Sequence, residues 1–130
     1  MTPSRPLASG LAVLAMSAAA ALPAAAARAV PTPDDTHGPC SGTARWELRA
    51  QPDDGLIRVR GEVDDAASGQ RWRWRLLHDG AVSARGYART DGGGGFDVQR
   101  YMVDAAGSDR IGWRAHNPRS GQTCRGGLTY

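Results

Sequence analysis

The chain has 130 residues, with 16 arginines, no lysine, 13 acidic residues and two cysteines. Its formal net charge is +3, but loss of Arg5 and Arg28 with the N-terminal segment described next leaves 14 arginines against the 13 acids. So small an excess of charge gives no general attraction to polyanions, and we expect no nucleic acid as a partner.

Residues 1–29 have the order of a secretory signal peptide. Arg5 precedes an apolar, alanine-rich run over 11–22, and small residues then allow cleavage after Ala27 or Ala29. The run is shorter than the roughly 20 apolar residues that span a bilayer, so we expect no stable membrane insertion of the mature chain. The protein is therefore predicted to be secreted, either extracellular or associated with the cell wall.

The mature chain of about 100 residues is long enough for one domain. Residues 30–39 contain three prolines among polar residues and are predicted to form a disordered lead-in to a domain over 40–130. The two cysteines are Cys40 and Cys124, and an even cysteine count in an exported chain predicts a disulfide between them.

Apolar and polar residues alternate in seven short segments of this domain, which is the pattern of half-buried β-strands. Turn sequences such as Pro-Asp-Asp-Gly and Asp-Gly separate the segments, and none has the period of an amphipathic helix. The seven segments are 43–50, 56–63, 70–78, 81–90, 96–103, 110–117 and 123–130.

The sequence RWRWR at 71–75 is either a core strand or a ligand-binding strip. Trp72 and Trp74 alternate with the arginines, so the rings and the cations lie on opposite faces. A stacking platform for single-stranded nucleic acid needs both on one face, so we assign the tryptophans to the core. In segment 96–103, Arg100 interrupts the apolar face, and we expect a bulge or a register change there.

These segments predict an all-β fold, a seven-stranded immunoglobulin-like Greek-key β-sandwich with one disulfide. A bridge from Cys40 to Cys124 brings together the beginnings of the first and last strands and favours their parallel pairing. The disulfide between the second and sixth strands and the tyrosine corner, which antibody domains have, are both missing from the sequence.

Three stretches of the chain carry a resemblance to other proteins: CSGTARWELRAQPDDG, GQRWRWRLLHDG and DRIGWRAHNPRSGQTCRG. They resemble a group of small secreted single-domain proteins of high-GC Gram-positive bacteria, which share CSG near the mature start, a PDDG turn and an NPxSGxTC segment. The resemblance covers nearly all of the mature chain. It implies a bacterial source, secretion and the disulfide, but the group has no established activity, so it implies no catalytic or binding residue.

No GxSxG elbow, HExxH zinc motif or P-loop is present in the sequence. His78 stands beside Asp79, but neighbouring residues of a strand point to opposite faces, which does not suit a catalytic pair. We therefore predict no catalytic residue, no enzyme activity and no cofactor. A small secreted hydrolase that uses His78 or His116 is the weakest alternative.

Aspartates occur in several turns that would lie at one end of a sandwich of alternating strands. They are Asp53, Asp54, Asp79, Asp104 and Asp109. Calcium prefers clustered carboxylates, but aspartate before glycine is ordinary turn chemistry, so we predict no metal site.

The segment NPRSGQTC predicts an exposed turn that ends at a disulfide. A rigid loop with arginine at the cleaved position can inhibit a trypsin-like protease, since pre-organisation favours tight binding. Arg119 and Ser120 are the candidate residues for this alternative function.

Arginine is concentrated on one predicted surface. In a Greek key of this layout the third, sixth and seventh strands form one sheet, and the outward residues include six arginines and no carboxylate. The arginines are Arg71, Arg73, Arg75, Arg110, Arg114 and Arg125. Because guanidinium groups bind phosphate and carboxylate bidentately, we predict a monomeric, non-catalytic protein that binds an anionic cell-wall polymer. An extracellular protein is the other partner considered.

Overall fold

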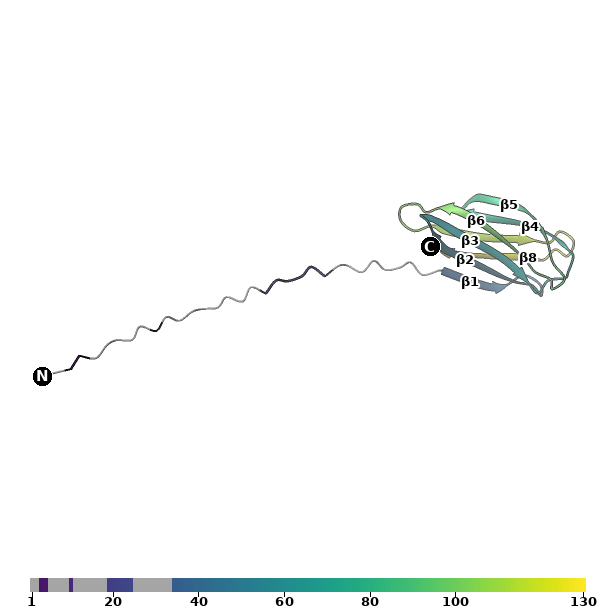
Figure 1. Cartoon of the computed structure of the whole chain (residues 1–130). Coiled ribbons are helices and arrows are strands. Elements are labelled where there is room, and N and C mark those ends of the chain that lie inside the picture. The colour runs from purple at the N-terminus through teal and green to yellow at the C-terminus, as the bar shows by residue number, and fades with distance from the viewer. Residues whose placement is uncertain (1–2, 5–9, 11–18, 25–33) are drawn as a thin grey trace.

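The computed structural model describes residues 3–4, 10, 19–24 and 34–130. Eight β-strands form two four-stranded sheets in which every pairing is antiparallel (Figure 1). The strands are β1 (Asp34–Pro39), β2 (Arg45–Asp53), β3 (Leu56–Asp64), β4 (Arg71–His78), β5 (Ala81–Arg89), β6 (Phe96–Val103), β7 (Arg110–His116) and β8 (Thr123–Thr129). The first sheet has the order β1-β2-β3-β6 and the second has the order β5-β4-β7-β8. Within the ranges that the structure describes, no helix is long and apolar enough to cross a membrane.

All seven predicted segments form strands, but the structure contains an eighth. Residues 34–39, which were expected to be disordered, form β1 and pair with β2 from Asp34 opposite Ala50 to Pro39 opposite Arg45. An edge strand needs hydrogen bonds on one side only, so it accepts polar residues and a terminal proline without an apolar pattern. Residues 30–33, and most of the predicted signal peptide, lie outside the described residues.

The alternating apolar residues of both sheets meet in one core. Trp72, Trp74 and Leu76 are buried as predicted, while the arginines between them are exposed. The indole rings of Trp74 and Trp113 stack with centroids 6.4 Å apart, and Phe96 lies 6.3 Å from Trp113. Large aromatic side chains thus lie at the centre of the core, among smaller aliphatic ones.

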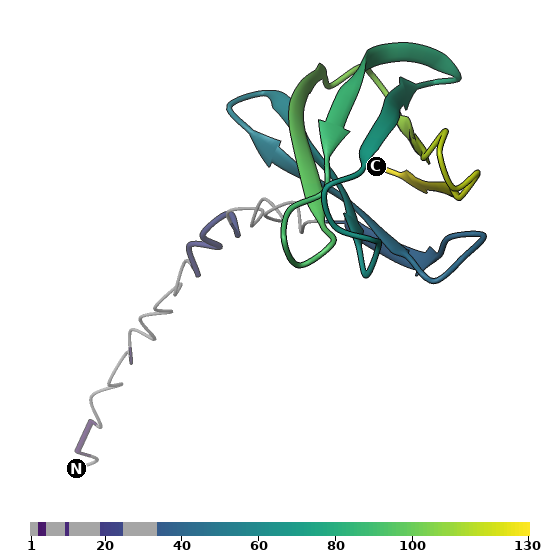
Figure 2. The same cartoon turned by 90° about the vertical axis from the view of Figure 1, so that its right-hand side faces the viewer.

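Two of the tryptophans fill space that glycines leave on the opposite sheet. A methyl group at Gly61 of β3 would overlap the ring of Trp113, and one at Gly126 of β8 would overlap the ring of Trp46. Both rings therefore reach the backbone of the facing strand. Figure 2 shows β7 and β8, which carry Trp113 and Gly126, side by side in the second sheet.

The predicted disulfide between Cys40 and Cys124 is confirmed. It joins the segment between β1 and β2 to the beginning of β8, and so connects the two sheets at one end. The backbone amide of Ser41 donates to the carbonyl of Thr123 over 2.8 Å beside it. The expected parallel pairing of the first and last predicted strands is wrong, because β2 pairs with β1 and β3 while β8 pairs with β7.

The bulge expected near Arg100 is absent from β6. Its register with β3 is continuous from Phe96 opposite Val63 to Val103 opposite Leu56. Arg100 keeps its place on the inner face because β6 is an edge strand, where the long side chain can cover the core and still reach water. Its guanidinium lies 5.0 Å from the ring of Trp74. The register shift in the second sheet lies instead between Leu76 and Leu77 of β4.

Substitution of either glycine at the sheet interface should destabilise the fold. We expect Gly61→Ala and Gly126→Ala each to cost about 1–3 kcal/mol of unfolding free energy, because the added methyl group displaces a buried ring. Gly92→Ala is the matched control, since no atom lies within 4 Å of a Cβ there. Thermal or urea unfolding checks this, and equal stability in all three variants would contradict the role of the glycines.

Loss of the disulfide should remove a large part of the stability. The two cysteines are 84 residues apart in sequence, and a closed loop of that length is worth roughly 4 to 5 kcal/mol in the chain-entropy account. We expect the Cys40→Ser, Cys124→Ser double variant to unfold at much lower urea concentration than the oxidised protein. Reduced wild-type protein should behave like the variant. If the urea midpoint of unfolding is the same in the variant and the oxidised protein, the bridge contributes little to stability.

Candidate functional site

Four arginines form one row across the outer face of the second sheet. Arg75 of β4 lies opposite Arg85 of β5 on one side and opposite Arg114 of β7 on the other, and Arg114 lies opposite Arg125 of β8. We call these four residues the arginine row. Neighbouring strands lie about 4.8 Å apart, so the row places one guanidinium on each strand in turn.

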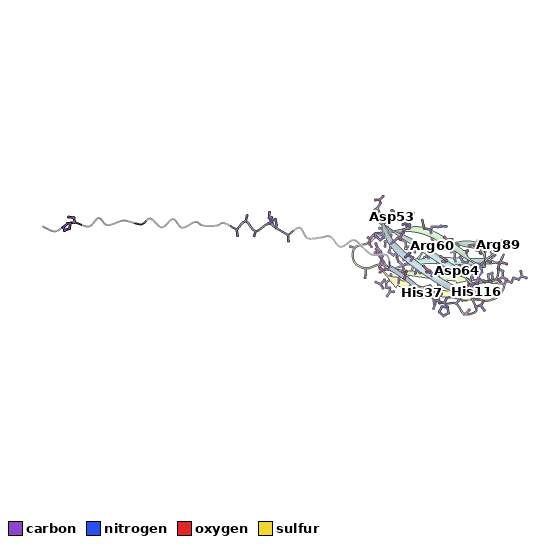
Figure 3. All side chains as sticks on the ribbon, turned by 60° about the horizontal axis from the view of Figure 1, so that its bottom comes forward. His37, Asp53, Arg60, Asp64, Arg89 and His116 are labelled. Atoms are coloured by element: carbon purple, nitrogen blue, oxygen red, sulfur yellow. A yellow bond between two sulfur atoms is a disulfide. The ribbon has the colours of Figure 1, made fainter. Side chains whose placement is uncertain are left out.

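The structure brings only three of the six arginines predicted for the binding face into that row. Arg75, Arg114 and Arg125 belong to it, whereas Arg71, Arg73 and Arg110 lie on the same face in other registers. The guanidinium of Arg71 stacks over the ring of Tyr87, 3.8 Å from its centroid. Figure 3 places Arg89 and His116 toward the end of the domain that lies away from Asp53.

Arg85 and Arg89 of β5 were not in the predicted set. The sequence carried a signal for them, because Asp79-Gly80 predicts a hairpin and a hairpin partner must lie in the same sheet. The observed pairing of β4 with β5 from Arg71 opposite Arg89 to His78 opposite Ala81 follows from that turn. The outer face of the second sheet therefore carries eight arginines rather than six.

Ion pairing differs sharply between the two sheets. In the first sheet Arg49 pairs with Asp35, Arg58 with Asp53, and Arg60 with both Glu62 and Asp97. In the second sheet none of the eight outer arginines forms an ion pair within residues 34–130. All 13 acidic residues of the chain lie in that range, so no acidic side chain lies within ion-pair distance of these arginines.

Arg114 is the most confined member of the row. Its side chain donates to the carbonyls of Trp113, over 2.8 Å, and Gly126, over 3.1 Å, and so lies along the sheet. Burial lowers the pKa of Arg114, and the charges of Arg125 and Arg75 lower it further. An anion bound over the row would relieve this repulsion.

The outer face of the second sheet is hollowed along the arginines. A hollow of about 640 Å³ is lined by Arg73, Arg75, Arg85, Gly86 and Tyr87. A smaller one of about 160 Å³ lies between β4, β7 and β8, and a third of about 600 Å³ extends over Gly112 and Gly127. Each of the three hollows has at least two guanidinium-bearing residues in its lining, so each could hold an anionic group.

The histidines considered for hydrolysis lie in different settings. His116 Nδ1 lies 3.2 Å from the hydroxyl of Thr123, and no carboxylate within the described ranges forms an ion pair with it. His78 Nε2 lies 2.6 Å from Asp109 Oδ1 and 3.6 Å from Asp79 Oδ2. Sequence reasoning missed the close partner Asp109, because it lies 31 residues away and only the pairing of β4 with β7 brings it near.

The turn with Arg119 and Ser120 is compact rather than extended. The side-chain oxygen of Asn117 accepts from the amides of Arg119 and Ser120, over 2.9 and 3.2 Å, and its carbonyl accepts from Gly121 over 2.8 Å. A segment that adds to a partner as an extended strand needs its main-chain groups free. This geometry does not favour a protease-inhibitory loop.

The aspartate-rich turns do fall at one end of the sandwich, as the alternation of strands requires, but they do not form an all-aspartate cluster there. Asp53 pairs with Arg58 and accepts from the hydroxyl of Tyr101 over 3.3 Å. Among the described residues, only Asp79 and Asp109 come together with a third potential metal ligand, which is His78.

No family model, curated protein or solved structure was found to match this chain.

The outer face of the first sheet carries acids in one register row, in contrast to the arginine row. Glu47, Glu62 and Asp97 lie opposite one another on β2, β3 and β6. A hydrogen bond with Asp64, partial burial and the charge of Asp64 raise the pKa of Glu62 to about 7, although Arg60 acts in the other direction.

This shift makes stability depend on pH. Between pH 4.5 and about 7 the folded state holds a proton on Glu62 that the unfolded state has lost, so the free energy of unfolding falls as pH rises through this window. Glu62→Gln cannot ionise at this position. We therefore expect the difference in melting temperature, variant minus wild type, to be larger at pH 8 than at pH 4.5. Asp54→Asn, in the β2–β3 turn, is the control. If the difference in melting temperature between Glu62→Gln and the wild type does not change with pH, the raised pKa of Glu62 is contradicted.

Proposed function

We propose that this protein is a secreted, monomeric, non-catalytic binding protein that holds an anionic polymer of the cell envelope on the outer face of its second sheet. The observation that carries the proposal is the arginine row, Arg85, Arg75, Arg114 and Arg125, which forms no ion pair with a carboxylate within residues 34–130. Like charges held side by side on a rigid sheet cost stability, and an anionic ligand would offset that cost.

The row suits a ligand with repeated negative charges. Guanidinium groups bind phosphate and carboxylate oxygens with two parallel hydrogen bonds, and such charge-assisted bonds are roughly twice as strong as neutral ones. A chain that runs across the strands would meet a guanidinium at every strand, about 5 Å apart. A single small anion would use only one or two of them.

Nucleic acid remains the less favoured polyanion. Base stacking needs exposed aromatic rings, and Trp72, Trp74 and Trp113 are all buried. Tyr87 is exposed, but the guanidinium of Arg71 covers one face of its ring. A phosphate-rich or carboxylate-rich polymer without bases makes better use of this surface.

The proposal of secretion draws on the signal-like residues 1–29 and on the resemblance to small secreted bacterial proteins. The disulfide between Cys40 and Cys124 is compatible with an extracellular location.

We also propose that the fold is an immunoglobulin-like Greek key with one added edge strand. With β1 set aside, β2, β3 and β6 match the first, second and fifth strands of that fold, and β4, β7 and β8 match the third, sixth and seventh. Buried Trp74 on β4, the third of these strands, supports the same assignment.

A charge-matched pair of variants tests the binding surface. We expect wild-type protein to bind immobilised teichoic acid at low salt and to be released as salt rises. The Arg75→Gln, Arg125→Gln double variant should bind about tenfold more weakly or worse, since charged hydrogen bonds contribute about 1.5–3 kcal/mol each. The Arg49→Gln, Arg58→Gln control removes the same charge from the first sheet and should bind within about twofold of wild type.

The two variants separate a specific surface from simple net charge. Equal losses of affinity in both double variants would mean that only the overall charge of the protein matters, which contradicts the proposal. Absence of binding by the wild type at low salt would also contradict it, provided that near-ultraviolet circular dichroism shows the tryptophan core intact.

A further inference from the structure

Three metal-ligating side chains converge at the end of the second sheet that lies away from the disulfide. His78 is the last residue of β4, Asp79 begins the turn to β5, and Asp109 immediately precedes β7. One ligand atom from each lies within 4.8 Å of the others. The chain residues between His78 and Asp109 include two strands, so this meeting arises from the pairing of β4 with β7.

Each side chain directs one ligand atom toward the other two, and His78 and Asp109 are hydrogen-bonded there. Asp79 Oδ1 accepts from the backbone amide of Arg110 over 2.8 Å, which leaves Oδ2 directed at His78 Nε2, 3.6 Å away. Asp109 Oδ1 lies 2.6 Å from the same nitrogen. A tetrahedral zinc ion with bonds of about 2.0–2.1 Å has ligand atoms about 3.3 Å apart, so small side-chain movements would complete the geometry.

The backbone holds these three residues in place. The amide of Asp79 donates to the carbonyl of Arg110 over 2.7 Å. Asp109 and Tyr130 exchange two backbone hydrogen bonds, of 2.9 and 2.7 Å, which tie the residue before β7 to the residue after β8. A site built on paired strands needs little ordering when an ion binds.

The charges of the cluster are unbalanced. Asp109 is 0% exposed, and its Oδ2 has no hydrogen-bond partner within the described residues. No arginine forms an ion pair with Asp79 or Asp109 in the same ranges, so one imidazole faces two carboxylates. A buried carboxylate with an unused oxygen is costly unless a cation lies beside it.

The cluster is open to solvent on one side. The side chain of Asp79 is 53% exposed and that of His78 is 20% exposed, whereas Asp109 is at the bottom. An ion can therefore enter past Asp79 without unfolding of the sheet. The open side also leaves room for a water molecule or a ligand oxygen as a fourth partner.

We propose that His78, Asp79 and Asp109 bind one divalent transition-metal ion of the zinc class. One imidazole nitrogen with two carboxylate oxygens suits zinc, whereas calcium and magnesium prefer sites made entirely of oxygen ligands. The ion would neutralise both carboxylates and join β4 to β7 at this end of the second sheet. This inference does not depend on the arginine row, which lies on different residues of the same strands.

The test is titration of metal-free, oxidised full-length domain with Zn²⁺, using calorimetry, and with Co²⁺, using visible absorption. We expect one ion per chain and a rise in melting temperature with Zn²⁺, because a ligand that binds only the folded state stabilises it. Ca²⁺ and Mg²⁺ should not compete at the same concentration.

Three variants make the result specific. Asp79→Asn keeps the oxygen that accepts from Arg110, so it should fold normally yet bind Zn²⁺ about tenfold or more weakly. His78→Gln should lose the one-to-one binding. His116→Gln removes a histidine elsewhere on the same sheet and should bind as the wild type does.

Absence of saturable Zn²⁺ binding by the wild type would overturn the proposal and leave a hydrogen-bonded His78–Asp109 pair only. Equal binding by all three variants, or tighter binding of Ca²⁺ than of Zn²⁺, would overturn it too. If His78→Gln fails to fold, the comparison of Asp79→Asn with His116→Gln decides the outcome.

Discussion

The contact between indole rings and glycines across the two sheets is the constraint on which the rest of the domain depends. Trp113 reaches from the second sheet to Gly61, and Trp46 reaches from the first sheet to Gly126. Packed sheets lie about 10 Å apart, and a large ring fills that space only where the facing residue has no side chain. A domain with a single phenylalanine can therefore form a dense core from a few tryptophans placed opposite glycines.

This core leaves most charged residues on the outer faces, with Arg100 and Asp109 as exceptions, and the pairing of strands decides which of them meet. In the first sheet the register aligns Glu47, Glu62 and Asp97, and Arg60 reaches two of these acids, Glu62 two residues along β3 and Asp97 diagonally on β6. In the second sheet the register β5-β4-β7-β8 aligns arginine with arginine on every strand. The two faces have similar alternation, but arginines of the first are paired with acids and those of the second are not, which is the basis for proposing the second as the binding surface.

Strands β4 and β7 contribute to both proposed sites. Arg75 and Arg114 point outward from the middle of these strands, and His78 and Asp109 lie where β4 ends and β7 begins. The disulfide connects the sheets at the opposite end, next to the start of β8. The disulfide thus fixes one end of the second sheet, and an ion at His78, Asp79 and Asp109 would fix the other, which would favour binding without rearrangement.

The sequence by itself determined the features that depend on neighbouring residues. Period-two alternation placed Trp72 and Trp74 in the core, turn residues separated the seven segments that became β2 to β8, and the cysteine count predicted the bridge from Cys40 to Cys124. Tertiary structure alone decided that polar residues 34–39 form an edge strand and that Arg100 covers Trp74 without a bulge. It also decided the alignment of Arg85 with the row and the burial of Asp109 beside His78. The physical reason is that alternation and turn chemistry act over a few residues, whereas strand register and sheet packing join residues far apart in the chain. The local sequence alone therefore does not specify register or packing.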